Sequence, residues 1–348
     1  MTEIEQPGEL RAQARDALQE ALHEIKRVIV GQDAMLERLL VSLLAGGHVL
    51  LEGVPGLAKT LTVKTLAAVL GGSYGRIQFT PDLVPADLVG TRVYRPDSGR
   101  FDTELGPVFA NFLLADEINR APAKVQSALL EVMQEQQVTI GGQTYAVPLP
   151  FIVMATQNPI ESEGTYPLPE AQVDRFLMKV LVDYPSLGEE AAVVGRSLGA
   201  QATVRECLAL ADLRRYEAAA ATVLVDRDAI GYAVALADAT RHPAAHGLQE
   251  IAGLIEFGAS PRGPIGLVQA ARVLALLRGR GHVEPADIRD LAADVLRHRL
   301  VLSYDALSDG VSADDVLDRV LAAVPAPGAG QLLSHAPADA ATAVVRRA

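Results

Sequence analysis

The side chains best suited to chemistry lie in two short segments, each directly after an apolar run. The first segment, residues 53–60, reads Gly-Val-Pro-Gly-Leu-Ala-Lys-Thr. A triphosphate requires inward-pointing backbone N–H groups, the amino terminus of a helix and a mobile cation, and such a segment can supply all three. Lys59 would reach the β- and γ-phosphates, and the Thr60 hydroxyl would bind Mg²⁺. The predicted phosphate-binding residues are Gly53, Val54, Pro55, Gly56, Leu57, Ala58, Lys59 and Thr60.

One position of this segment departs from the usual phosphate-binding loop, which has a glycine where this chain has Ala58. We expect alanine to be tolerated there, because the position contributes an N–H at the start of a helix and alanine is a good helix former. Taken alone, the segment could also be a glycine-rich turn before an amphipathic helix.

The second segment ends in two adjacent carboxylates, Asp116 and Glu117, after the apolar residues 112–115. Asp116 would hold Mg²⁺, through water, and Glu117 would polarise the attacking water. An isolated Asp-Glu pair is more often a solvated strand end. This pair, however, follows a second buried strand downstream of a loop that requires it. Together the segments predict binding and hydrolysis of ATP with Mg²⁺.

Five short apolar runs alternate with helical segments and would position these residues. The runs are residues 48–53, 76–80, 110–115, 151–156 and 177–182. This alternation predicts an α/β fold with a parallel sheet covered on both faces. In such a sheet the ligand site lies beyond the carboxyl ends of the strands. Both segments fall there, and so does Asn158.

The rest of the chain divides by composition. We expect a helical lead-in over 1–19, an α/β nucleotide-binding domain over 20–184, and a smaller all-α lid over 190–310 with no convincing strand. The active site is expected in the cleft between the two domains. From Val324 onward, proline, glycine and alanine predict a flexible tail over 324–348. Two hairpins, over 93–101 and 138–145, are not needed for the sheet and are candidate working loops.

Bulk composition limits the classes of function. The net charge of −12 disfavours wholesale binding to a nucleic-acid backbone. The single Cys207 rules out an intramolecular disulfide, and with no signal-like amino terminus this indicates a cytoplasmic location. No run approaches the ~18 apolar residues that a membrane span needs. The basic cluster at 297–299 is expected to complement a helix carboxyl terminus.

Several segments resemble those of the MoxR-type AAA+ ATPases, which belong to the helix-2-insert group. These segments are residues 53–60, 115–126, 155–159, 169–176 and 258–262. The resemblance covers about residues 20–310, and alanine at position 58 is itself typical of this family's loop. It implies a P-loop AAA+ domain followed by a helical lid.

The resemblance also implies roles that spacing alone could not assign. Asn158 resembles sensor 1, which helps position the attacking water. Arg175 resembles the arginine finger, which touches a neighbour's nucleotide, whereas an isolated Asp-Arg-Phe would by default pair Arg175 with Asp174. Arg262 resembles sensor 2, which contacts the γ-phosphate from the lid. The segment that would lie against the adenine, or simply cap a helix, is Val30, Gly31 and Gln32.

The implied activity is Mg²⁺-dependent ATP hydrolysis by a homo-oligomeric, hexameric ring with Arg175 supplied in trans. It would drive chaperone-like remodelling or maturation of partner complexes, with a von Willebrand factor A domain protein as the expected partner. The alternatives are a nucleic-acid motor, since helicase subunits share the helix-2 insert, and a metal-chelatase motor subunit. Nucleic acid is disfavoured by the charge and by the second hairpin, which lacks Lys and Arg over 138–145. A non-hydrolysing nucleotide switch conflicts with the intact Glu117, Asn158 and Arg175.

Overall fold

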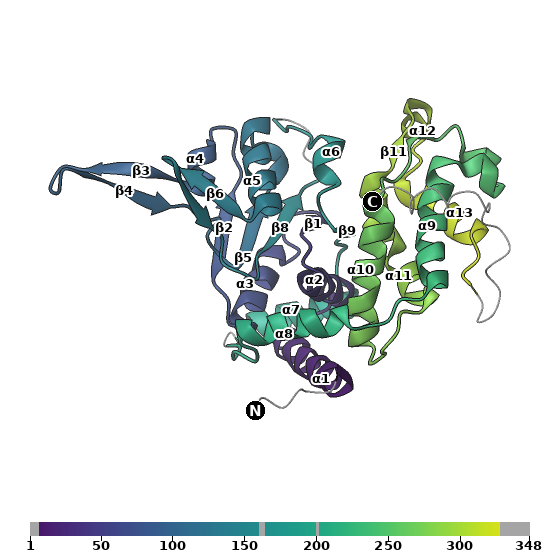
Figure 1. Cartoon of the computed structure of the whole chain (residues 1–348), viewed down its shortest axis with the longest axis horizontal. Coiled ribbons are helices and arrows are strands. Elements are labelled where there is room, and N and C mark those ends of the chain that lie inside the picture. The colour runs from purple at the N-terminus through teal and green to yellow at the C-terminus, as the bar shows by residue number, and fades with distance from the viewer. Residues whose placement is uncertain (1–6, 160–163, 200–201, 328–348) are drawn as a thin grey trace, which may run out of the picture.

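A five-stranded parallel sheet forms the centre of the protein in a computed structural model that describes residues 7–159, 164–199 and 202–327 (Figure 1). The strands lie in the order β2-β5-β8-β1-β9. Their bounds are Tyr74–Gln78 for β2, Phe112–Asp116 for β5, Ile152–Gln157 for β8, Val49–Glu52 for β1 and Met178–Leu181 for β9. The α/β fold class and all five predicted strand runs are confirmed. Most of the predicted tail, residues 328–348, lies outside the described residues.

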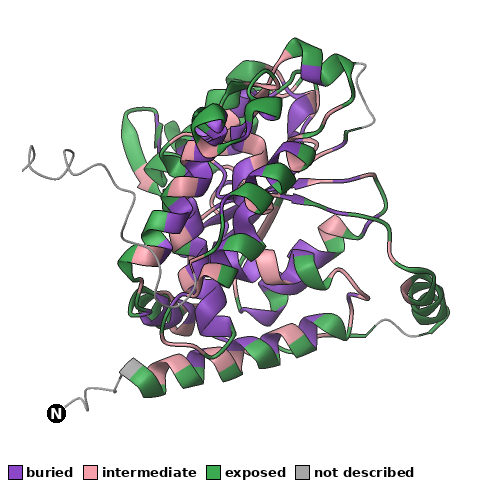
Figure 2. Cartoon of the chain, turned by 90° about the vertical axis from the view of Figure 1, so that its right-hand side faces the viewer, coloured by how far each residue is buried: buried purple, intermediate pink, exposed green. Residues whose placement is uncertain are grey.

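The sheet is apolar because each face contacts its own hydrophobic core. Alternate residues of β5 belong to different cores, so Phe112 and Leu114 face one side while Leu113 and Ala115 face the other. The first core is covered by α2 (Asp33–Leu44) and α3 (Lys59–Val69), and the second by α5 (Ala123–Glu135). Figure 2 shows the buried residues gathered in the sheet and on the helix faces that cover it.

Both predicted hairpins are present. The first consists of β3 (Gly90–Arg95) and β4 (Arg100–Leu105), which follow the short helix α4 (Pro85–Val89). The second consists of β6 (Gln137–Ile140) and β7 (Gln143–Ala146). In Figure 1 the β3–β4 hairpin projects from the body on the side opposite the lid.

The lid packs beside the β9 edge of the sheet. Its helices are α9 (Arg227–Arg241), α10 (Arg262–Leu277), α11 (Pro285–Leu296), α12 (Tyr304–Ser308) and α13 (Ala313–Ala323). The expectation that this region holds no strand was wrong, because β10 (Ile255–Phe257) pairs with β11 (Val301–Leu302). These strands of three and two residues are too short to show a period in the sequence. Short helical turns, η2 (Pro243–His246), η3 (Gln249–Ile251) and η4 (Arg297–Arg299), join the lid elements.

Helix α1 (Pro7–Lys26) runs without interruption through the boundary predicted at residues 19 and 20. It packs on α8 (Leu210–Ala221), and its Ala14 and Leu18 are fully buried. By contrast, no residue of α7 (Leu187–Ser197), which is described along its whole length, is buried. No helix within the described ranges is both long and apolar enough to cross a membrane.

Candidate active site

The predicted phosphate loop joins β1 to α3 and lines a cavity of about 350 Å³. The same cavity is lined by Asp116 and Glu117 at the end of β5, and by Thr156 and Asn158 at the end of β8. The structure therefore brings together the loop, the acidic pair and Asn158 at the carboxyl edge of the sheet. All these lining residues lie within 20–184. No described residue of the lid lines this cavity, whereas we had expected the site to lie between the two domains.

Two glycines shape the loop for different reasons. Gly56 has a φ of +89°, a backbone conformation that L side chains rarely adopt. Gly53 instead allows a close approach, because a Cβ there would lie 2.5 Å from the carbonyl oxygen of Val182. The loop can therefore lie close against the residue that follows β9.

Ala58 does not occupy the helical conformation that we expected. It is the N-cap of α3, with φ 55° and ψ 17° in the left-handed region. Helix propensity therefore does not explain why alanine is tolerated. A residue with a Cβ in this conformation costs about 1 kcal/mol relative to glycine.

The Lys59 side chain folds back over the loop. Its Nζ donates hydrogen bonds to the carbonyl oxygen of Gly53 and, at 3.3 Å, to that of Val54. Burial lowers the pKa of Lys59, whereas the nearby carboxylates of Asp116 and Glu117 act to raise it. A phosphate group would give this half-buried ammonium a stronger partner than the backbone carbonyls.

Both carboxylate oxygens of Asp116 have donors. Oδ1 accepts a hydrogen bond of 2.6 Å from the Thr156 hydroxyl, and Oδ2 accepts one of 2.8 Å from Nη2 of Arg76. The hydrogen bond to Asp116 raises the pKa of Arg76. Arg76 and Thr156 were not among the predicted site residues. For Arg76 the sequence did hold a signal, because it is a charged residue within a run that otherwise predicts a buried strand.

Glu117 is also held by a residue of β2. Its Oε2 accepts hydrogen bonds from Nε2 of Gln78 at 2.7 Å and from Nη1 of Arg120 at 3.2 Å. Its backbone N–H donates to the Thr156 hydroxyl at 2.8 Å, and its φ of 56° is left-handed. Left-handed conformations outside glycine concentrate at functional sites. Gln78 also accepts a hydrogen bond of 3.0 Å from Arg76, so two neighbouring side chains of β2 hold the carboxylates of Asp116 and Glu117.

The predicted adenine segment does not line the cavity but lies close to the loop. Nε2 of Gln32 donates to the carbonyl oxygen of Asp183 at 3.0 Å, and Asp183 directly follows the Val182 that contacts Gly53. A Cβ at Gly31 would collide with the Glu189 carboxylate. Gln32 is the N-cap of α2, as the helix-cap alternative predicts, although its side chain makes no capping hydrogen bond.

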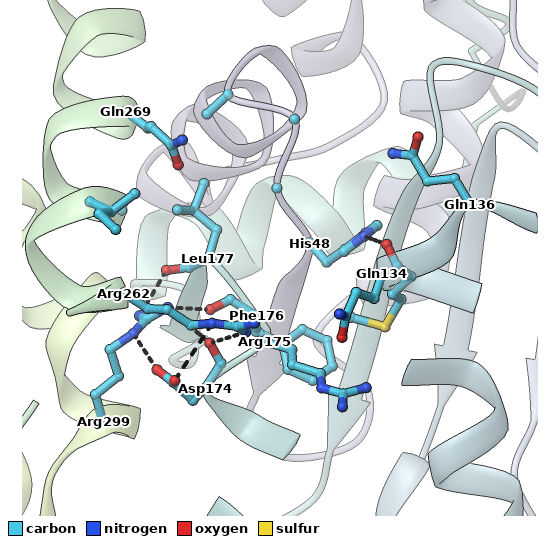
Figure 3. Close-up of a pocket in the computed structure, with 16 residues that line it drawn as sticks. His48, Gln134, Gln136, Asp174, Arg175, Phe176, Leu177, Arg262, Gln269 and Arg299 are labelled. Atoms are coloured by element: carbon cyan, nitrogen blue, oxygen red, sulfur yellow. Dashed lines mark hydrogen bonds and ion pairs between the residues drawn. The ribbon is translucent and has the colours of Figure 1, made fainter. Parts of the chain in front are cut away.

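Arg175 and Arg262 line a different cavity, of about 340 Å³, at the start of β9 (Figure 3). The Asp174 carboxylate accepts hydrogen bonds from Ser260 and Arg299, and lies 3.9 Å from Arg262. No ion pair joins Arg175 to Asp174 within the described part of the chain, which disfavours the default pairing. Within one chain the structure therefore separates these two arginines from the phosphate cavity.

The residues present fit a nucleotide with Mg²⁺. Thr60 and Asp116 supply the hard oxygen donors that Mg²⁺ prefers, in the same cavity as Lys59 and the amino terminus of α3. Comparisons with known proteins decide the family. A model of the ATPase family associated with various cellular activities (AAA) matches residues 48–178, and a model of the AAA lid domain matches residues 249–320. The chaperone MoxR1 of Mycobacterium tuberculosis is 57% identical over 310 residues, which are 89% of this chain and 82% of that protein.

The chain belongs to the MoxR family of AAA+ ATPases. The MoxR protein of Paracoccus denitrificans is 36% identical over 321 residues, covering 87% of this chain and 94% of that protein. A solved structure from Cytophaga hutchinsonii, described as a candidate ATPase, superposes with a TM-score of 0.87 and 46% identity, covering 92% of this chain and 98% of that one. This MoxR-type protein is therefore a nucleotide-binding enzyme that hydrolyses ATP.

Proposed function

We propose that this MoxR-type ATPase works as a homo-oligomeric, hexameric ring in which each active site is completed by a neighbouring subunit. One observation carries the proposal. One cavity is lined by Lys59, Asp116, Glu117 and Asn158, whereas Arg175 lines another. The arginines beside this cavity, Arg76 and Arg120, are paired with Asp116 and Glu117. We therefore expect a second copy to supply Arg175 to the phosphates.

The roles within one subunit follow from the chemistry of the side chains. Lys59 and the loop N–H groups would bind the phosphates, and Thr60 and Asp116 would hold Mg²⁺, the latter through water. When bound, Mg²⁺ neutralises negative charge on the phosphates. Gln78 and Arg120 fix the orientation of the Glu117 carboxylate, which would accept a proton from the attacking water. Asn158, which is buried, would orient that water.

The neighbouring subunit would contribute its Arg175 and, from the same cavity edge, its Arg262. We had expected Arg262 to reach the γ-phosphate of its own chain. Its position beside Asp174 supports a role in trans instead. Supplying an arginine to a phosphoryl-transfer site is worth ~10³–10⁵ in rate in related systems.

The work done by hydrolysis would be chaperone-like remodelling or maturation of partner protein complexes in the cytoplasm. The similarity to a protein named a chaperone supports this proposal. The β3–β4 hairpin offers a contact surface, because its Tyr94 and Phe101 are 52% and 57% exposed. A von Willebrand factor A domain protein remains the partner we propose, and a metal-chelatase motor subunit remains the nearest alternative.

The nucleic-acid motor is less well supported by the same hairpin. Arg95 pairs with the carboxylates of Asp102, at 3.5 Å, and Glu104. Arg92 lies over the Phe101 ring, 5.1 Å from its centre. Over residues 90–105 the three arginines are balanced by three carboxylates, so the hairpin offers no net positive charge to a phosphate backbone.

The test is the ATPase rate measured against protein concentration, with molecular mass followed on the same samples. We expect specific activity to rise steeply as the ring forms. In mixing experiments, Arg175→Ala and Glu117→Gln subunits, each inactive alone, should regain activity together because one provides Glu117 and the other Arg175. A constant specific activity from a monomer would overturn the shared site, and so would the absence of rescue in mixed rings shown to form.

A further inference from the structure

A buried arginine of the lid, Arg299 in η4, contacts the segment that carries Arg175. The Arg299 side chain is only 3% exposed. We had expected the basic cluster 297–299 to complement a helix carboxyl terminus, and one Arg299 N–H does so by donating to the carbonyl oxygen of Val295 in α11. Nη1 also lies 2.8 Å from Nε2 of His298, and the other hydrogen bonds of this guanidinium cross to the nucleotide-binding domain.

These donors bind residues on both sides of Arg175. Nε of Arg299 donates to Oδ1 of Asp174 at 2.9 Å. Nη2 donates to the carbonyl oxygen of Phe176 at 2.7 Å, and Nη1 to that of Leu177 at 3.2 Å. Arg175 therefore sits between residues that one lid side chain holds in place. Figure 3 shows the Asp174 carboxylate turned toward the lid arginines, while Arg175 extends to the opposite side.

Other lid residues converge on Asp174. The Ser260 hydroxyl donates to Oδ2 of Asp174 at 3.0 Å, and Nη1 of Arg262 donates to its carbonyl oxygen at 3.4 Å. Burial lowers the pKa of Arg299 to about 10, and the Asp174 carboxylate opposes this decrease, so the guanidinium stays charged at neutral pH. A buried charge of this kind is stable only while its partners remain in place. The lid and this segment are thus expected to move as one unit.

We infer that Arg299 is a positioning residue, which with Asp174 fixes the lid to residues 174–177 and so sets where Arg175 is presented to the neighbouring subunit. The inference rests on the proposed trans role of Arg175. It adds that a displacement of the lid in one subunit is transmitted to the active site of the next. Arg299 itself lines the cavity of Arg175 and not the phosphate cavity.

The test is the variant Arg299→Lys, which keeps the positive charge. It replaces the planar guanidinium by a single ammonium group, which cannot reach the Asp174 carboxylate and two carbonyl oxygens at once. We expect its kcat to fall at least 10-fold with nucleotide affinity unchanged, because its own phosphate loop is intact. Mixing with Glu117→Gln subunits, which present an intact Arg175 edge, should restore activity. A residue with a merely structural role would not give this pattern.

Arg38→Lys is the matched control. Arg38 also links the two domains, since it donates to Asp294 at 2.7 Å and to the carbonyl oxygen of Asp290 at 2.9 Å, both in α11. It does not contact residues 174–177, so its lysine variant should keep near-normal kcat. Equal behaviour of the Arg38 and Arg299 variants would overturn the inference.

A second variant covers failure of Arg299→Lys to fold. Asp174→Asn keeps the shape of the side chain and removes its charge, and it should show the same loss of kcat and the same rescue. Loss of nucleotide binding in both variants, or a kcat deficit that Glu117→Gln subunits do not rescue, would count against a positioning role. If Arg175→Ala is itself not rescued by Glu117→Gln, the shared-site function fails rather than this inference.

Discussion

At the scale of single residues, Ala58 holds a left-handed conformation at the entrance to α3. Glycine adopts this conformation without a Cβ penalty, so Ala58→Gly should raise the free energy of unfolding by about 1 kcal/mol. Urea denaturation of the nucleotide-free protein would measure the change. Ala68→Gly is the matched control, because Ala68 is an exposed helical residue of α3 and its replacement should cost about 1 kcal/mol. Similar destabilisation by both changes would contradict the strain at Ala58.

The pairing of Arg76 with Asp116 makes a second prediction at this scale. Arg76 occupies one oxygen of a carboxylate that would hold Mg²⁺ through water, so a cation must compete with the guanidinium. Arg76→Gln should lower the Mg²⁺ concentration needed for half-maximal binding of fluorescent ADP by on the order of 3–10-fold, given that Arg76 is half exposed. Arg120→Gln, which removes a partner of Glu117 instead, should leave that concentration unchanged. A higher Mg²⁺ requirement in Arg76→Gln would show that the arginine assists the site.

At the scale of elements, His48 joins the start of β1 to two neighbours. Its Nδ1 accepts a hydrogen bond of 3.0 Å from the Val153 N–H of β8, so the N–H lies on Nε2, which donates to the Met133 carbonyl oxygen of α5 at 3.1 Å. Burial lowers the pKa of His48 to about 4. The folded state therefore keeps this histidine neutral at pH values where the unfolded chain protonates it.

The unfolded state binds more protons below the ordinary histidine pKa, so the contribution of His48 is fully present above about pH 6.5 and is lost as pH falls toward 4. Keeping His48 neutral in the folded state should lower the free energy of unfolding by about 2 kcal/mol between pH 7 and pH 5. His48→Gln can keep one donor and one acceptor but cannot titrate. Between pH 7 and pH 5 the unfolding free energy of this variant should therefore fall by about 2 kcal/mol less than that of the unaltered protein. Parallel pH profiles of the two proteins would contradict the prediction.

The elements that the sequence predicts well are those with a local cause. Parallel strands buried on both faces form continuous apolar runs, and the Gly-Gly turn at 141–142 marks the second hairpin. Pairing of β10 with β11 depends on contacts between distant parts of the lid, so no local pattern predicts it. For the same reason Arg76 and Gln78 were missed, since their partners lie on β5 and only the sheet order brings them together.

At the scale of the whole molecule, the position of the lid is what the sequence could not supply. The family resemblance implies that Arg262 lies in the lid, and helix α10 does begin at this residue. Spacing does not reveal which edge of the sheet that helix approaches. Long-range contacts such as Arg299 with Asp174 and Arg38 with Asp294 determine the docking, and they leave the phosphate cavity without a lid residue.

The charge of the whole chain gives the last prediction. The net charge of the protein is −12, and Arg95 of its first hairpin is paired with Asp102 and Glu104. We therefore expect no DNA-stimulated ATPase activity at any salt concentration. ATPase assays between 50 and 200 mM salt, with and without single- and double-stranded DNA, would measure this. Replacing Asp102 and Glu104 by their amides would release Arg95 and should create weak DNA affinity that salt removes. Stimulation of the unaltered protein, with a steep salt dependence, would favour a nucleic-acid motor over a protein remodeller.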